Sequence, residues 1–105
     1  MSLDVPFPDL PRVRFGRLAL YGDVVANDIV IVLPDPRSAL QIAKRAFDVE
    51  NTGSGYLLHN IPAAPMRLNR VEVLKGKPRK LRPGSTLWVG SVLTVDFVGE
   101  SRDEV

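Results

Sequence analysis

The last third of the chain carries the pattern that most restricts the fold. Its apolar residues approach period-two spacing on either side of Gly90-Ser91, which predicts two short strands joined at a turn; they are Leu87, Val89, Val92 or Leu93, Val95 and Phe97. A hairpin alone is at best marginally stable in water, because its apolar face stays uncovered. The earlier part of the chain must therefore supply a second sheet to cover that face.

The preceding segments contain strand patterns and strong turn signals. Residues 13–21 predict one bent strand or two short ones with a solvent face, since basic and apolar side chains alternate there. Residues 29–33 form a β-branched run ended by two prolines, which predicts a buried central strand. The turn signal of residues 51–55 lies between two apolar segments and predicts a β-hairpin.

Three further segments complete the expected architecture. Residues 38–46 fit either one helical turn, which Ser38 could cap, or the lead-in to a strand. Residues 66–74 alternate apolar and polar side chains and predict another pair of short strands, whereas residues 75–82 predict a polar loop. The expected fold class is all-β, a sandwich of about ten short, mostly antiparallel strands.

The composition is that of one globular domain. A chain of 105 residues allows a single core, and 45% apolar and 25% charged residues are ordinary proportions. The lack of cysteine excludes a disulfide framework, a thiol nucleophile and a cysteine-ligated zinc site, and it fits a reducing compartment. The sequence shows no export signal and no apolar run long enough to span a membrane. We therefore expect a soluble, cytoplasmic domain, which could be a segment of a longer protein.

The proline pattern and the polar end suggest three parts. Residues 1–12 are expected to form an extended arm, because three prolines fix the backbone and remove its donors. Residues 13–99 are expected to form the sandwich, and residues 100–105 a polar C-terminal tail.

The order of these motifs resembles the forkhead-associated (FHA) domain. Residues 22–31 are similar to the family's Gly-Arg, short spacer, Asn-Asp-Ile and apolar strand. Residues 56–61 look like the strand before the family's asparagine loop, and residues 81–90 are similar to its closing leucine, glycine-polar, apolar and isoleucine-glycine signature. The resemblance covers residues 18–97 and implies a β-sandwich of the kind that usually recognises phosphothreonine peptides.

The sequence departs from the family where the phosphopeptide is bound. The family's phosphate-gripping arginine falls on Asp23, whose carboxylate would repel a phosphate. Gly16-Arg17 supplies an arginine, but Arg17 lies ten residues before Asn27 and the family's spacing is four, so this correspondence is poor. The asparagine-glycine that holds the peptide backbone falls on Ala64-Pro65, which offers no side-chain amide. Asn69 matches a later, structural asparagine of the family.

The family's serine and histidine can be placed in two ways. Ser38 fits the serine position if Gln41 stands for the histidine and the hairpin turn carries an insertion. Ala43 and Ala46 fill the two positions if the spacing to Tyr56 has no gap, and we prefer this alignment. The resemblance thus implies the sandwich and argues against ordinary phosphothreonine binding. The sequence is also similar to the degenerate FHA domains of bacterial secretion-ring proteins, in which the fold acts as an assembly surface.

Isolated polar residues do not form a catalytic or metal-binding pattern. His59 is expected to be an outward or hydrogen-bonded strand residue, because no nucleophile or second ligand accompanies it. Asp23, Asp28 and Asp35 match no calcium loop and are explained as turn residues. Trp88 is expected to belong to the core. We therefore predict no enzyme, no metal and no cofactor.

A basic run precedes the final hairpin. Lys75, Lys77, Arg79 and Lys80 could contact an anion, although a solvated loop is the interpretation that we favour. The net charge of +2 is too small to indicate nucleic acid by itself. A small basic β-barrel that binds nucleic acid through this run remains an alternative.

The function expected from these features is that of a non-catalytic protein interaction module, acting in assembly or signalling. Its protein or peptide partner would be bound through loops at one end of the sandwich or through an exposed sheet edge. The candidate contact residues are Asp23, Ser38, Arg45, Arg67 and Asn69. A variant of this hypothesis is a phosphopeptide reader with a displaced cationic site, built on Arg45 or Arg67.

Overall fold

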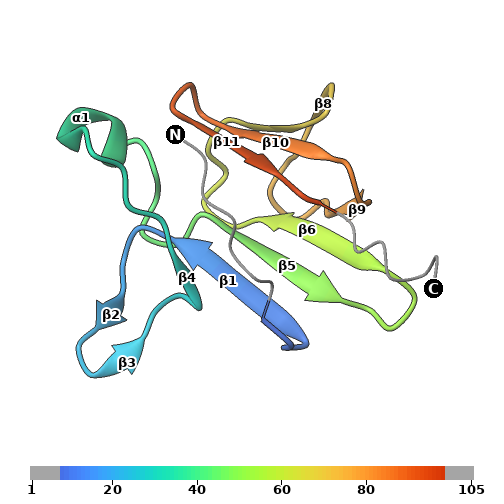
Figure 1. Cartoon of the computed structure of the whole chain (residues 1–105), viewed down its shortest axis with the longest axis horizontal. Helices are drawn as coiled ribbons and strands as arrows, with labels where there is room; N and C mark the ends of the chain where they lie inside the picture. Colours follow the sequence, from blue (N-terminus) through green and yellow to red (C-terminus); the bar gives the residue numbers. More distant parts are fainter. Residues whose placement is uncertain (1–7, 99–105) are drawn as a thin grey trace.

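The computed structural model describes residues 8–98 and has an all-β fold in two packed layers (Figure 1). Eleven short strands and one four-residue helix occur in these residues: β1 (Arg12–Gly16), β2 (Leu20–Tyr21), β3 (Val24–Val25), β4 (Ile29–Val30), α1 (Pro36–Ala39), β5 (Phe47–Asn51), β6 (Tyr56–Asn60), β7 (Met66–Leu68), β8 (Val71–Glu72), β9 (Arg79–Leu81), β10 (Thr86–Val89) and β11 (Leu93–Asp96). This confirms the predicted fold class.

One layer is a five-stranded sheet in the order β4-β1-β5-β6-β9. Its pairs are antiparallel except β1 with β4, which run parallel. The predicted hairpin around residues 51–55 is confirmed as β5 and β6, because Asn51 pairs with Tyr56 at its closed end. The predicted strand of residues 13–21 divides into β1 and β2, the second of the two forms left open by the sequence.

The other layer is a four-stranded sheet in the order β11-β10-β7-β8. It confirms both predicted strand pairs, the final hairpin β10–β11 and the pair β7–β8. Leu87 lies opposite Val95 and Val89 opposite Leu93, so the apolar residues of the hairpin share its inner face.

The core lies between the two layers. Phe15 and Phe47 face each other across β1 and β5, with their rings stacked 4.5 Å apart. The largest fully buried side chains come from strands of both layers and from the segments next to them: Phe47, Ile42, Leu58, Leu87, Val13, Val49 and Val73. The sandwich is therefore closed by the alternate residues of strands from both halves of the chain.

Two strand predictions were wrong in placement. Residues 29–33 do not form a buried central strand, because only β4 is paired and it lies at the sheet edge. Ile29, Ile31 and Leu33 pack against the core while Val32 is 81% exposed, so one face of residues 29–33 is exposed to solvent. Residues 75–82 are not a loop throughout, because β9 pairs with β6 and anchors itself by burying Leu81.

The segment before β5 begins with the helical turn α1. The predicted cap was wrong, because Asp35 caps this turn by accepting from the backbone N–H of Arg37. Ser38 lies within the helix and donates its hydroxyl to Asp35 at 2.9 Å. The helix and the β2–β3 ribbon project from the same side of the sandwich (Figure 1).

The expected arm and tail fall largely outside this description. Residues 1–7 of the arm and all of residues 100–105 lie outside the described residues. In the described part of the chain, no helix is long and apolar enough to cross a membrane.

Candidate functional site

An apolar hollow opens at the end of the sandwich where three connecting segments meet. It has a volume of about 240 Å³. Its lining comes from the segment before β5, the β6–β7 loop, the β10–β11 turn and the adjoining ends of β7 and β10: Gln41, Ala43, Ala46, Pro62, Ala64, Pro65, Met66, Val89 and Gly90. Only Gln41 among these residues has a polar side chain, and none is charged. We call this cavity the loop-end hollow.

A buried asparagine holds the β6–β7 loop in place. Asn60 is 3% exposed, and its side-chain amide donates to the carbonyls of Ala64 at 2.9 Å and Val73 at 2.8 Å. The loop is tied on its other side, because the N–H of Gly90 donates to the carbonyl of Pro65 at 2.9 Å. Sequence reasoning missed Asn60, although an asparagine at a strand end before a proline-rich loop is a recognisable signal.

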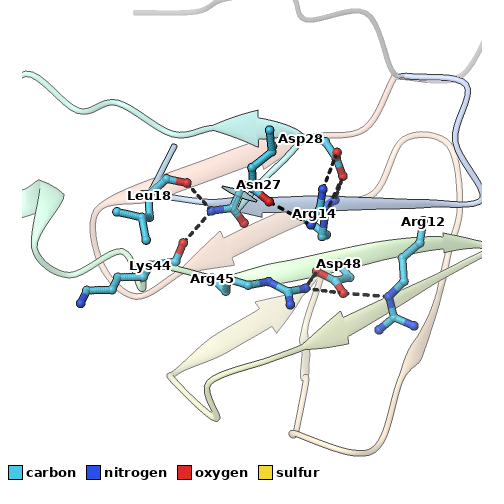
Figure 2. Close-up of polar contacts among 9 residues, drawn as sticks. Arg12, Arg14, Leu18, Asn27, Asp28, Lys44, Arg45 and Asp48 are labelled. Atoms are coloured by element: carbon cyan, nitrogen blue, oxygen red, sulfur yellow. Dashed lines mark hydrogen bonds and ion pairs between the residues drawn. The ribbon is translucent and has the colours of Figure 1, made fainter. Parts of the chain in front are cut away.

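A second buried asparagine fixes the segment before β5 (Figure 2). The amide of Asn27 donates to the carbonyls of Leu18 and Lys44, both at 2.7 Å. Gly16 passes beneath this contact, where a Cβ atom would collide with the Lys44 carbonyl and the Asn27 amide. The position of the segment that lines the loop-end hollow thus depends on a glycine and an asparagine from distant parts of the chain.

A second hollow adjoins the first and is lined in part by charged residues. It measures about 330 Å³ and shares Pro65, Met66 and Gly90 with the loop-end hollow, while its other lining residues are Arg67, Arg70, Glu72 and Trp88. We call it the arginine hollow. The expectation that Trp88 belongs to the core was wrong, because Trp88 alternates with the buried Leu87 and Val89 and so points to the outer face.

Arg67 and Trp88 are neighbours on that outer face. They are directly opposite in the β7–β10 register, and the guanidinium carbon of Arg67 lies 5.4 Å from the centre of the indole ring. This distance allows a cation–π interaction. Within residues 8–98, Arg67 makes no ion pair, although Glu72 lies directly opposite it in the β7–β8 register and lines the same hollow.

Arg45 is engaged elsewhere, as Figure 2 shows. One of its terminal nitrogens donates to both carboxylate oxygens of Asp48, at 2.8 and 2.9 Å. Arg12 reaches the same carboxylate at 2.7 Å. Asp48 is 2% exposed, so its two cations compensate a buried charge. Arg45 therefore has a structural partner and lines neither hollow.

The other predicted contact residues are not brought together. Asp23 is exposed in the turn between β2 and β3, and Ser38 lies in α1, bonded to Asp35. Asn69 has a positive φ of 55° in the β7–β8 turn, and its side-chain oxygen accepts from the N–H of Thr86 at 3.0 Å. The structure thus places Asn69 in a turn-stabilising position and separates it from Asp23 and Ser38.

The remaining candidate residues form no catalytic group. His59 bonds to Glu50 at 2.8 Å across β5 and β6, which confirms the expected hydrogen-bonded strand histidine. Among residues 8–98, no three His, Asp or Glu side chains gather closely enough to hold a metal ion. The basic residues Lys75, Lys77, Arg79 and Lys80 are all exposed, and the last two belong to β9.

Solved FHA domains have the same fold. An engineered FHA domain with a Myc-pTBD peptide is 22% identical, with a TM-score of 0.58 over 74% of this chain and 54% of its own. The N-terminal FHA domain of S. cerevisiae Rad53p, in complex with a phosphothreonine peptide, is 20% identical, with a TM-score of 0.58 over 78% of this chain and 58% of its own. The FHA domain of an Arabidopsis thaliana hypothetical protein is 17% identical, with a TM-score of 0.62 over 85% of this chain and 69% of its own.

These similarities concern the fold. The chain spans a little over half the length of the first two structures, 54% and 58%. No protein-family model matches the chain, and no curated protein matches it. The FHA-like β-sandwich expected from the motif order is nevertheless confirmed, because the structural matches extend over most of the chain.

Proposed function

We propose that this chain is a non-catalytic protein interaction module that binds a short segment of a partner protein in the loop-end hollow. The observation that carries the proposal is the hollow itself, a cavity of about 240 Å³ with an apolar lining and without a charged residue. Such a lining suits an apolar side chain of a peptide, and the backbone groups of the loops can orient it. The partner would belong to a cytoplasmic assembly or signalling complex.

Recognition in this hollow does not require a phosphate. Ala43, Ala46, Ala64 and Pro65, which take the family's phosphopeptide-binding positions in the preferred alignment, all line the loop-end hollow. None of their side chains can donate a hydrogen bond to a phosphate dianion. Asp23, which takes the position of the family's arginine in the alignment from the sequence, is exposed in a ribbon turn and would repel a phosphate.

A second candidate is a phosphopeptide reader with a displaced cationic site. The arginine hollow favours it, because Arg67 and Arg70 line this cavity against the single carboxylate of Glu72, and because it adjoins the loop-end hollow. Arg67 is the better candidate of the two cations predicted from the sequence, since Arg45 is held by Asp48. The two candidates differ in whether affinity depends on the phosphate.

The test is an NMR titration of the labelled chain with a degenerate phosphothreonine peptide library and its unphosphorylated twin. The first candidate predicts equal shifts from both libraries at Ala43, Ala46 and Ala64. Shifts from the phosphorylated library alone, centred on Arg67 and lost in Arg67→Ala, would establish the second candidate instead.

A matched pair of variants locates the binding site. Ala64→Glu places a carboxylate in the loop-end hollow and should abolish the shifts. Ala19→Glu adds the same charge at an exposed position and should leave them unchanged. The proposal is wrong if neither library shifts any residue of the hollow, or if Ala64→Glu binds as well as Ala19→Glu.

A further inference from the structure

The strand β9 forms one edge of the five-stranded sheet. It pairs with β6, where Leu81 lies opposite Tyr56 and Arg79 opposite Leu58. Within residues 8–98, no strand pairs with its other side. An edge of this kind presents unpaired backbone N–H and C=O groups, to which another extended segment can add.

The same edge carries an uncompensated positive charge. Residues 75–82 hold five of the fourteen Lys and Arg residues and no Asp or Glu, so the rest of the chain has nine basic and twelve acidic residues. All five cations are exposed, and none makes an ion pair within the described part of the chain. They are Lys75, Lys77, Arg79, Lys80 and Arg82.

The cations are placed where an added strand would meet them. Arg79 and Lys80 are consecutive strand residues, so their side chains project from opposite faces of the sheet. Lys75 and Lys77 flank the tight turn at Gly76, which the N–H of Lys77 closes by donating to the carbonyl of Leu74 at 3.1 Å. A segment beside β9 would therefore have positive charge near both of its faces and near one end.

From the unpaired edge and these charges, we infer that β9 binds an acidic, extended peptide segment of a partner protein by strand addition, at a site separate from both hollows. A peptide supplies alternating backbone donors and acceptors to the strand edge, and its carboxylates match the cations. Nucleic acid fits less well, because its phosphates are acceptors only and leave the carbonyl groups of the edge unpaired.

The experiment uses the full chain and a labelled peptide of about ten Glu and Thr residues, long enough to pair along a whole strand. Two comparison peptides separate charge from pairing. One replaces each Glu by Gln, and the other keeps the charges but carries N-methyl groups on alternate backbone amides, so that it cannot form a ladder. We expect the acidic peptide to bind and to shift the amides of Arg79, Lys80 and Leu81, and both comparison peptides to bind at least about tenfold more weakly.

Charge-reversal variants test whether the acidic peptide binds at β9. Arg79→Glu with Lys80→Glu should weaken binding of the acidic peptide by about tenfold or more, because attraction becomes repulsion at both positions. Arg37→Glu with Lys44→Glu changes the net charge equally at exposed positions outside β9 and should have little effect.

Three results would overturn the inference. Equal affinity for the N-methylated peptide would mean attraction by charge alone, without an added strand. Equal weakening by the Arg37 and Lys44 reversals would show an effect of net charge and not of β9. Tighter binding of a DNA duplex than of the acidic peptide at the same salt concentration would assign the edge to nucleic acid.

Discussion

Arg14 and Asp28 form the charge pair whose titration is most clearly tied to the fold. The Arg14 side chain donates to Asp28 at 3.1 and 3.0 Å, and its backbone N–H donates at 2.8 Å. The side-chain hydrogen bonds from Arg14 hold the pKa of Asp28 below its usual range, against the opposing effect of burial. Since the carboxylate is favoured in the folded state, its stabilisation is complete above the unfolded pKa of about 3.9 and is lost as the pH falls through the folded pKa.

Asp28→Asn should therefore lower the free energy of unfolding near neutral pH, by on the order of 1 kcal/mol. The difference from the parent chain should shrink as the pH falls below about 4, where Asp28 becomes protonated in the unfolded chain, and should vanish below the lowered pKa of Asp28 in the folded chain. Urea unfolding followed by the fluorescence of Trp88, the single tryptophan, measures both quantities. Asp23→Asn is the control, because Asp23 is exposed and makes no ion pair in residues 8–98. A difference that does not change with pH would contradict this assignment.

Asn60 gives a prediction about a buried amide. Asn60→Ala removes the donors to the carbonyls of Ala64 and Val73 and leaves both without these bonds. We expect the free energy of unfolding to fall by about 2 kcal/mol, since unpaired buried polar groups are costly. Asn51→Ala, at the exposed end of β5, removes one exposed hydrogen bond from the N–H of Gly53 and should cost less than about 1 kcal/mol. Equal losses in urea unfolding would show that Asn60 is not the anchor of the β6–β7 loop.

The junction of β1 with the segment before β5 depends on Gly16. The chain leaves β1 hydrogen-bonded to that segment, from the N–H of Arg17 to the carbonyl of Ala43 at 3.1 Å. Gly16→Ala inserts a methyl group against the Lys44 carbonyl and the Asn27 amide, so this junction must separate. We expect a loss of about 2 to 4 kcal/mol in the free energy of unfolding.

Gly53→Ala is the matched control for Gly16→Ala. Gly53 has a positive φ of 87° and open space at its Cβ position, so the substitution strains only the backbone, by about 1 kcal/mol. The midpoint temperatures of thermal unfolding of the two variants compare the cost of the steric collision with the cost of the backbone strain. If the Gly16→Ala variant proves as stable as the Gly53→Ala variant, the junction tolerates the methyl group.

Local patterns predicted the strands better than they predicted the position of each strand in the sheets. The hairpins around residues 51–55 and Gly90 were predictable, because their turn residues and alternation lie close together in the sequence. The edge positions of β4 and β9 were not predictable, because the composition of a β-branched or basic segment does not determine which strand it will pair with. Trp88 shows the same limit, since its outward direction depends on the register of β10.

The site was less predictable than the fold. The loop-end hollow is formed by segments around Ala43, Ala64 and Gly90, which only the folded sandwich brings together. The family resemblance pointed to Ala43, Ala46 and Ala64-Pro65, and these do line one cavity. It gave no sign of the arginine hollow, because Arg70 and Trp88 become neighbours only through the pairing of β7 with β10 and β8.

The two proposed binding surfaces lie on different parts of the molecule. The loop-end hollow is built on the segments that adjoin Asn60, whereas β9 pairs with the other half of β6, from Tyr56 to Leu58. No residue of β9 lines either hollow. Lys75, one of the cations that flank β9, forms a bridge with Asn60, but it lines neither hollow. Substitutions more than about 7 to 10 Å apart that share no partners usually add within about 0.5 kcal/mol.

We therefore predict that the two surfaces bind their peptides independently. The affinity for the acidic peptide should be the same in Ala64→Glu as in the parent chain, and saturating acidic peptide should not change the affinity of the loop-end hollow for its library ligands. Because coupling between two binding equilibria is reciprocal, isothermal titration in both orders must give the same answer. A change of more than about threefold in either order would exceed the 0.5 kcal/mol expected of separate sites. It would mean that strand addition at β9 is transmitted along β6 to Asn60 and the loop that it holds.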